Sequence, residues 1–133
     1  MQRFVDAQEP VYERVLDELR AGSKRTHWMW FIFPQIAGLG RSAMSVEFAI
    51  TSLAEATAYL AHPLLGARLR DCSALMLATA GRSAEAILGR PDDAKFHSSL
   101  TLFAQVHPTD PVFAACLEKY FAGRPDPHTL SRL

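Results

Sequence analysis

The stretch HWMWFIFPQ, residues 27–35, is the segment that decides how this chain folds. Its aromatic residues crowd together ahead of Pro34, and the helical pattern of the rest of the chain does not explain them. They are Trp28, Trp30, Phe31 and Phe33. Whichever backbone form the segment adopts, we expect that these side chains cannot all face one core. The segment is therefore expected either to brace the surrounding helices or to line a ligand pocket.

Outside this stretch, the order of prolines, capping residues and glycines is typical of a chain of short helices. The predicted helices span residues 10–22, 52–62, 63–81, 83–88, 92–107 and 110–122, and residues 126–133 add a final turn. Ser52 and Glu55 form a capping box, and Asp92 or Asp93 is expected to cap the helix that follows it. No long alternation of apolar and polar residues predicts a strand. We therefore expect one mainly α domain over residues 1–133, a compact single-domain orthogonal helical bundle of about six or seven helices with little or no sheet.

The composition is that of a folded globular protein without a net charge. Of 133 residues, 49% are hydrophobic, and 14 Lys and Arg balance 14 Asp and Glu. A chain of this length buries roughly two thirds of its unfolded surface, so a sufficient core is expected without disulfides or structural metals. Because there is no net positive field, binding of bulk nucleic acid is not expected.

The two cysteines, Cys72 and Cys116, fall on apolar helical faces and are expected to pack as buried thiols. Neither has a second Cys or His within a few residues, so we expect no metal and no cofactor. Acidic residues and a proline interrupt the N-terminal segment where a secretory signal would be apolar. The longest apolar run, residues 28–33, is far shorter than the ~20 residues that a membrane crossing needs. We therefore expect a soluble, cytoplasmic protein with no membrane partner.

Polar residues around the aromatic stretch favour a ligand pocket. His27 titrates near neutral pH and Gln35 offers an amide. The backbone around Gly38 and Gly40 suits either an anion or a plain turn. The densest basic cluster, within residues 20–25, is either a solvated helix end or a site for a small anion.

A second polar block lies on the predicted helix 92–107. Lys95, Ser98 and Ser99 share one face of that helix, away from an apolar stripe. Because serine and threonine are poor choices for the interior of an exposed helix, this face and Thr101 belong either to solvent or to a site.

His62 and Arg68 flank the start of the predicted helix 63–81. His62 precedes a proline and is expected to cap this helix rather than to take part in catalysis. Arg68 either pairs with Glu55 or Asp71 or binds a phosphate or carboxylate with its planar guanidinium group, and the sequence leaves these alternatives open.

Three blocks resemble a known family: HWMWFIFPQIAGLGRS (27–42), HPLLGARL (62–69) and KFHSSLTLF (95–103). RFVDAQ, ELRAGSK and YFAGRPDPHTL extend the similarity in order over nearly the whole chain. Together they resemble the family called domain of unknown function 1810. The matching motif positions are His27, Trp28, Trp30, Gln35, Gly38, Gly40, His62, Gly66, Arg68, Asp93, Lys95, Ser98 and Thr101. The resemblance implies a compact, mainly helical single domain from bacteria or fungi; some members carry a calpastatin-like label, and no activity is implied.

Two functions of different classes fit these residues. The first is binding or hydrolysis of a nucleotide-like small molecule, specifically an ADP-ribose-type ligand, because tryptophan stacks on bases while Gly, Arg and Lys donors hold phosphate. Its candidate ligand-binding residues are His27, Trp28, Trp30, Gln35, Gly38, Gly40, Arg68, Ser98 and Thr101. Hydrolysis would take place at a glycosidic carbon, with Glu55 or Asp93 as acid or base and Lys95 stabilising charge.

The alternative is a non-catalytic module whose aromatic patch around Trp28 and Trp30 seats a partner protein or a second copy of the chain, giving a homodimer. The sequence leaves open whether the protein is an enzyme. The two hypotheses differ in whether the polar candidates converge on one concave pocket or scatter as capping and packing residues. The candidates in question are His27, Gln35, Arg68, Lys95 and Ser98.

Overall fold

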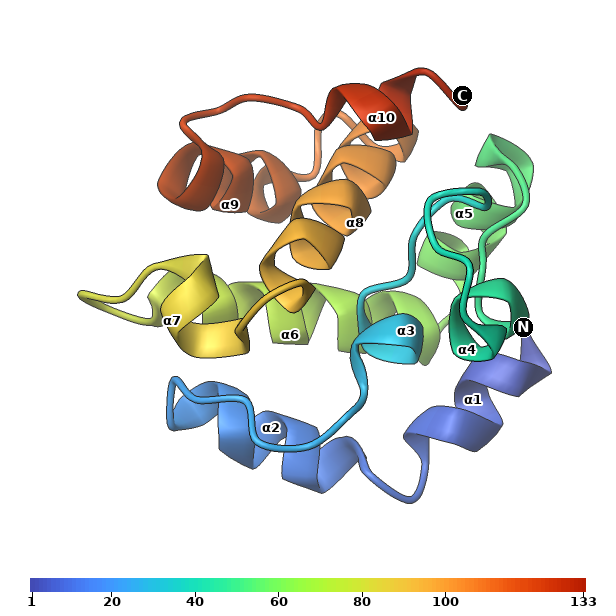
Figure 1. The fold of residues 1–133 in the computed structure, drawn as a ribbon. Coiled ribbons are helices and arrows are strands. Elements are labelled where there is room, and N and C mark those ends of the chain that lie inside the picture. The colour runs from blue at the N-terminus through green and yellow to red at the C-terminus, as the bar shows by residue number, and fades with distance from the viewer.

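Ten helices and no strand make up the regular structure of the computed structural model, which describes all 133 residues (Figure 1). In chain order they are α1 (Gln2–Gln8), α2 (Tyr12–Arg20), α3 (Met29–Ile32), α4 (Ala43–Glu47), α5 (Leu53–Ala61), α6 (Leu65–Ala78), α7 (Ala84–Leu88), α8 (Asp92–Val106), α9 (Pro111–Phe121) and α10 (Pro127–Leu130). The expected mainly helical class is confirmed. The expected count of about six or seven helices is too low, because a helix is recognised in sequence only when it is long enough to repeat an apolar pattern or has a capping residue.

The three helices that the sequence did not predict are α1, α3 and α4. No side chain caps α1 or α3, so nothing in the sequence marks where either begins. Ser42 caps α4 by accepting the backbone N–H of Ser45, but a helix of 5 residues is too short to repeat an apolar position. α3 is a single turn inside the aromatic stretch.

Most predicted helix boundaries are confirmed by their caps. The Ser52 hydroxyl accepts the N–H of Glu55 at 3.1 Å, while the Glu55 carboxylate accepts the N–H of Thr51 at 3.0 Å. The start of α8 differs from the prediction, because Pro91 occupies the cap position and Asp92 and Asp93 lie in the first turn. Carboxylates in that turn still stabilise the positive end of the helix.

The buried hydrophobic residues form one continuous cluster of 28 side chains. α6 packs against α2, α5 and α9, and α8 packs against α5, α7, α9 and α10. In Figure 1, α8 rises steeply from the level of α6, with α9 and α10 beside it. The only extended pairing is a single bridge between Ile36 and Ile50, which ties the segment after α3 to the residues before α5.

Three of the four aromatic side chains in residues 27–35 face this one core and Trp30 does not, in line with the expectation that not all four would do so. Trp28 and Phe33 are 1% exposed and Phe31 is 6% exposed. The reason is local: α3 ends after one turn, and Phe33 leaves it at φ −121° and ψ 73°, so side chains that a longer helix would separate turn inward. Only Trp30 stays partly exposed, at the edge of the core.

α5 and α6 approach so closely that a glycine is needed where they meet. A Cβ atom built on Gly66 would overlap the carbonyl oxygen of Leu60. Beside this contact, His62 Nδ1 accepts the N–H groups of Leu64 at 3.1 Å and Leu65 at 3.2 Å. The expected capping role of His62 is therefore confirmed.

Cys72 and Cys116 are free thiols with no exposed surface, as expected. Burial raises the pKa of each thiol to about 12. None of the ten helices is both long enough and apolar enough to cross a membrane.

Candidate functional site

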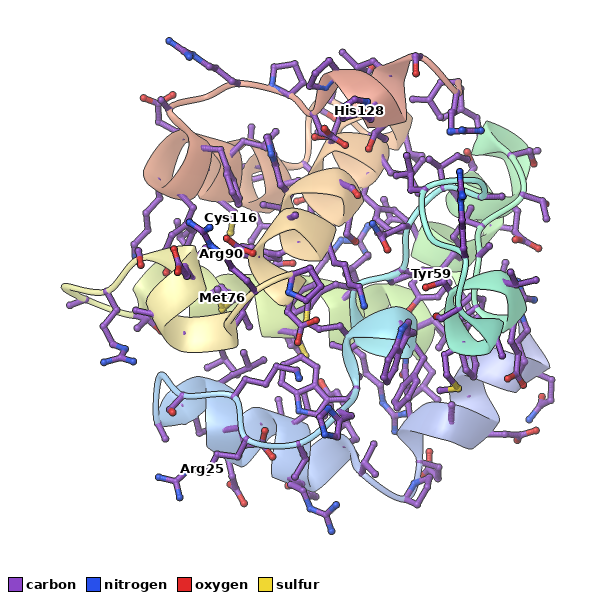
Figure 2. The ribbon with its side chains drawn as sticks, in the orientation of Figure 1. Arg25, Tyr59, Met76, Arg90, Cys116 and His128 are labelled. Atoms are coloured by element: carbon purple, nitrogen blue, oxygen red, sulfur yellow. The ribbon has the colours of Figure 1, made fainter.

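A cleft of about 570 Å³ opens between the segment after α3, the first half of α8 and the segment that contains α10. We call it the main cleft. Its polar and charged side chains are Gln35, Lys95, His97, Ser98, Asp126, His128, Ser131 and Arg132, and Gly38, Leu39 and Gly40 form one edge. Figure 2 shows His128 on α10, above α8.

Five of the residues singled out in the sequence converge on the main cleft: Gln35, Gly38, Gly40, Lys95 and Ser98. The side-chain amide of Gln35 donates a hydrogen bond to the hydroxyl of Ser98 at 2.8 Å. Ser98 is only 2% exposed, so this bond fixes the segment after α3 against α8. On the predicted polar face of α8, Lys95 and Ser98 therefore line the main cleft.

The side chains that the sequence reasoning missed come from the other end of the chain. Arg132 reaches across the cleft to Gly38, where a Cβ atom would overlap its guanidinium group and where φ is +97°. His128, Ser131 and Asp126 line the same side. The block YFAGRPDPHTL was the available signal, since it includes two of these residues, but nothing in it predicts that the chain returns to α8.

His97 is a further cleft residue that the sequence did not single out. Its Nε2–H donates to the carbonyl oxygen of Arg124 at 2.7 Å, and its ring stacks on Phe121 with centroids 4.0 Å apart. A carbonyl oxygen can only accept, so the neutral ring carries its proton on Nε2 and leaves Nδ1 as an acceptor.

Thr101 has a structural role instead of the expected ligand contact. Its side chain has no exposed surface, and its hydroxyl accepts the backbone N–H of Asp126 at 2.9 Å while donating to the carbonyl oxygen of His97 at 2.8 Å. Asp126 in turn caps α10 through Thr129. Thr101 therefore holds α10 in place beside α8.

A second cavity of about 380 Å³ adjoins the main cleft, and the two share Pro91 and Lys95. Its charged and titratable side chains are Lys24, Arg25, His27, Arg90, Asp92 and Lys95, over a floor that includes Trp28, Met29, Trp30 and Leu88. Three more predicted residues, His27, Trp28 and Trp30, thus line the second cavity and not the main cleft.

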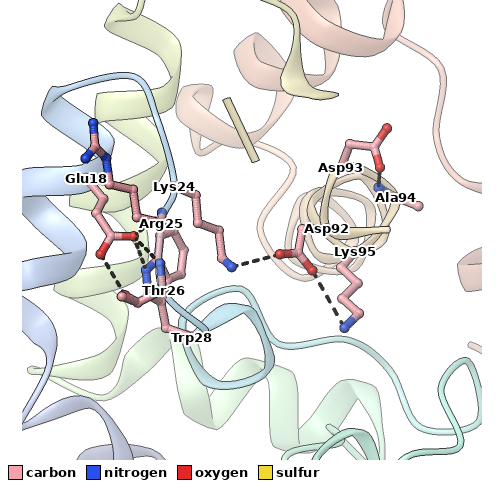
Figure 3. A network of polar contacts seen from close by, with 9 residues as sticks. All are labelled: Glu18, Lys24, Arg25, Thr26, Trp28, Asp92, Asp93, Ala94 and Lys95. Carbon is pink, nitrogen blue, oxygen red and sulfur yellow. Dashed lines mark hydrogen bonds and ion pairs between the residues drawn. The ribbon is translucent and has the colours of Figure 1, made fainter. Parts of the chain in front are cut away.

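Asp92 connects the lysines of the second cavity. Its carboxylate lies 2.9 Å from Lys24 Nζ and 3.8 Å from Lys95 Nζ (Figure 3). Lys24 Nζ is also 5.2 Å from the Trp28 ring centre, and Lys95 Nζ is 4.9 Å from that of Trp30. Both lysines are therefore held in place by an acid and an aromatic face.

Glu18, buried at 7% exposure, fixes the backbone that carries Arg25 and His27. Its carboxylate accepts the N–H groups of Arg25 at 2.6 Å and Thr26 at 2.9 Å, the Thr26 hydroxyl at 2.7 Å and the Trp28 indole N–H at 3.1 Å (Figure 3). Burial alone would raise the pKa of Glu18, but these hydrogen bonds lower it to about 2. Trp28 is therefore a core residue tied to Glu18 that also borders the second cavity.

Besides Thr101, three predicted site residues lie outside both cavities. Glu55 pairs with Arg3 at 3.3 Å, and the Asp93 carboxylate accepts the N–H of Ala94 at 2.9 Å. Arg68 bonds neither Glu55 nor Asp71; it contacts Glu9 at 3.1 Å and Gln8 at 3.3 Å and stacks over Tyr12. Each of them has a local structural partner, and none faces the ligand-sized space.

The two cavities together carry an excess of positive charge. The cations are Lys24, Arg25, Arg90, Lys95 and Arg132, and the carboxylates are Asp92 and Asp126. No three His, Cys, Asp or Glu side chains gather closely enough to hold a metal ion. The arrangement suits an anionic small molecule, held by guanidinium, ammonium and amide donors.

Comparison with known proteins gives a family but no activity. The crystal structure of the conserved hypothetical protein Rv1873 from Mycobacterium tuberculosis is 53% identical in sequence, covers 99% of this chain and 94% of its own, and superposes with a TM-score of 0.98. No curated protein is significantly similar to the chain. The family model described as "Protein of unknown function (DUF1810)" matches residues 1–133. The chain therefore belongs to the DUF1810 family.

Proposed function

We propose that the protein binds a small phosphorylated, nucleotide-like molecule in the main cleft, with ADP-ribose-type ligands as the first class to test. The observation that carries the proposal is the convergence of Lys95, Arg132 and His128 with the Gln35–Ser98 pair on one cleft of about 570 Å³. That volume is within the range of small-molecule sites.

The charges of the main cleft support an anion in preference to a neutral ligand. Lys95 and Arg132 are its fixed cations, and Asp126 is its only carboxylate. Asp126 is already engaged, since it accepts hydrogen bonds from the N–H and hydroxyl of Thr129. An incoming phosphate therefore meets Arg132, which forms no ion pair, and Lys95, whose only ion pair, with Asp92, is long at 3.8 Å.

The flat groups beside the cations support a ligand with a ring. His97 is held in a fixed plane by the Phe121 ring and by the Arg124 carbonyl oxygen. Rigid flat side chains of this kind stack on a base or sugar face at little entropic cost.

The proposal is one of binding, without carboxylate-based hydrolysis. Most enzymes that cleave a glycosidic bond use two carboxyl groups that flank the bond, and neither of the alternative predicted acids, Glu55 or Asp93, lines a cavity. Asp92 and Asp126, which do line the cavities, are tied to lysines and to a helix cap.

The alternative, an exposed aromatic docking patch, receives less support. Trp28 is 1% exposed, which leaves Trp30 as the only tryptophan with accessible surface. The most exposed large hydrophobic residues are Val46, Leu53, Leu130 and Leu133, and none of them is aromatic. Single exposed hydrophobic residues of this kind are common on protein surfaces and do not indicate a binding site for a partner protein.

A thermal-shift screen tests the proposed binding. ADP-ribose, NAD and nucleoside phosphates at millimolar concentration are expected to raise the Tm of the wild-type protein, because a ligand at about 100 times its Kd adds roughly 2.7 kcal/mol of stability. Arg132→Ala is expected to abolish the shift, and Arg14→Ala, an exposed arginine on α2 away from both cavities, is expected to keep it. No shift for any ligand with the wild-type protein would refute the proposal.

A further inference from the structure

We infer that the second cavity is a phosphate subsite, so that the ligand carries a second phosphate group separate from the one in the main cleft. The inference rests on the proposed function and specifies its ligand class: a nucleotide with two separated phosphate groups, such as a nucleoside bisphosphate. The first step is that the two cavities are neighbours, because Pro91 and Lys95 line both of them. One molecule can therefore extend from one into the other past the Lys95 ammonium group.

The second step is the charge that remains after the internal ion pairs are made. Asp92 is the only acid of the second cavity, and Lys24 at 2.9 Å compensates it. The Arg25 guanidinium makes no hydrogen bond or ion pair within the chain; only its backbone N–H is bound, to Glu18. Arg90 pairs only with Glu85, and both side chains are more than half exposed. The Arg25 guanidinium group is thus unpaired, and an anion can draw the Arg90 guanidinium group away from its exposed pair with Glu85.

The third step is the rigidity of the cavity wall. The four hydrogen bonds to the Glu18 carboxylate hold residues 25–28, and the Lys24 side chain is 6% exposed between Asp92 and Trp28. The start of α8, a helix of 15 residues, borders the same cavity through Pro91 and Asp92. The positive end of this helix's dipole adds to the positive electrostatic field in the cavity. A basic cavity that is fixed in the free protein binds a dianionic phosphate without first having to be ordered.

Calorimetry with matched ligands tests this subsite. Adenosine 5′-monophosphate and adenosine 3′,5′-bisphosphate differ by one phosphate group, and the wild-type protein is expected to bind the bisphosphate about 10- to 100-fold more tightly at the same ionic strength. In the double variant Arg25→Ala/Arg90→Ala this advantage is expected to fall to about twofold or less, while monophosphate affinity stays unchanged. Both side chains are exposed, so the variant is expected to fold. NAD and NADP form a second pair that differs by one phosphate group.

The controls separate a failure of the subsite from a failure of the proposed function. Arg132→Ala is expected to weaken both adenosine ligands by a similar factor, because it acts in the main cleft. Arg14→Ala is expected to preserve the bisphosphate advantage, which excludes a loss caused by net charge alone. Equal affinity of the wild-type protein for both ligands, or an advantage that survives in the double variant, overturns the subsite alone. Absence of binding by either ligand pair overturns the subsite and the proposed function together.

Discussion

Lys95 holds its ammonium nitrogen 4.9 Å from the centre of the Trp30 indole ring, at the point where the main cleft meets the second cavity. The side chain is about one fifth exposed and its only ion pair, with Asp92, is long at 3.8 Å. The indole face therefore orients the charge without neutralising it.

Lys95→Met keeps the length of the side chain and its packing on Trp30 but removes the charge. We expect the affinity for ADP-ribose-type ligands to fall about 10- to 100-fold, because a charge-assisted hydrogen bond to phosphate contributes about 1.5–3 kcal/mol. Titration calorimetry measures the loss. Lys95→Arg is expected to retain most of the affinity, and Glu55→Gln, outside both cavities, to retain all of it. Unchanged binding by Lys95→Met would remove Lys95 from the site.

Acid is expected to destabilise the protein through Glu18. Its pKa is about 2 in the folded protein against 4.5 as its ordinary value, so the unfolded chain takes up a proton first as the pH falls. The stabilisation is fully present above about pH 4.5 and is lost between that pH and about 2, and it amounts to about 3 kcal/mol. Urea denaturation at a series of pH values measures it.

Glu18→Gln isolates this contribution. An amide offers one acceptor oxygen where the carboxylate offers two, so the four donors around residue 18 cannot all be satisfied. We expect a loss of about 1–3 kcal/mol at pH 7 and a weaker acid dependence between pH 4.5 and 2.5 than in the wild-type protein. Glu13→Gln, on the exposed face of the same helix, is the matched control and is expected to change little. An equal effect of both variants would show that Glu18 is not the responsible group.

Gly66→Ala is expected to destabilise the protein by about 1–3 kcal/mol, because the new Cβ atom meets the carbonyl oxygen of Leu60. This change in stability has the opposite sign to the usual one, since Gly→Ala within a helix ordinarily stabilises a protein by about 1 kcal/mol. Ala67→Gly at the exposed neighbouring position is expected to cost about 0.5–1 kcal/mol by propensity alone. Chemical denaturation of both variants measures the two effects, and a stabilised Gly66→Ala would disprove the close approach of α5 and α6.

The two thiols are expected to be inert in the folded protein. Cys72 and Cys116 have no exposed surface, and burial raises each pKa to about 12, so almost no thiolate forms at pH 8. A chromogenic disulfide reagent is expected to label both rapidly in denaturant and neither at a comparable rate in buffer. Rapid labelling of the native protein at pH 8 would contradict the burial of at least one thiol.

The parts of the fold that could be predicted from sequence are those set by local chemistry. Ser52, His62 and Asp110 cap helices as expected, because a capping side chain acts on backbone groups two or three residues away. α3 could not be predicted in this way. Its one turn is maintained by burial of aromatic side chains against α1, α6 and α8, which is a tertiary effect that overrides local signals.

The candidate site divides along the same line. Lys95 and Ser98 lie three residues apart on one helix, so sequence spacing could place them on a common face. Arg132 and Gly38 are 94 positions apart in sequence, and they meet because α10 packs against α8, where Thr101 binds the backbone of Asp126. No local sequence pattern predicts that the C-terminal segment packs back against α8. Glu55 and Arg68 had the right chemistry for a site, but their partners are structural, and only their positions in space reveal it.

The dual role of α8 has a practical consequence for changing what the protein recognises. This helix contributes seven buried residues and also carries Lys95 and His97 into the main cleft. Randomising it in a directed-evolution library would mix altered selectivity with lost folding in nearly every clone. His128 and Ser131 on the opposite rim are exposed and lie outside the 28-residue core, and a library built on these two positions can diversify selectivity while the scaffold stays intact.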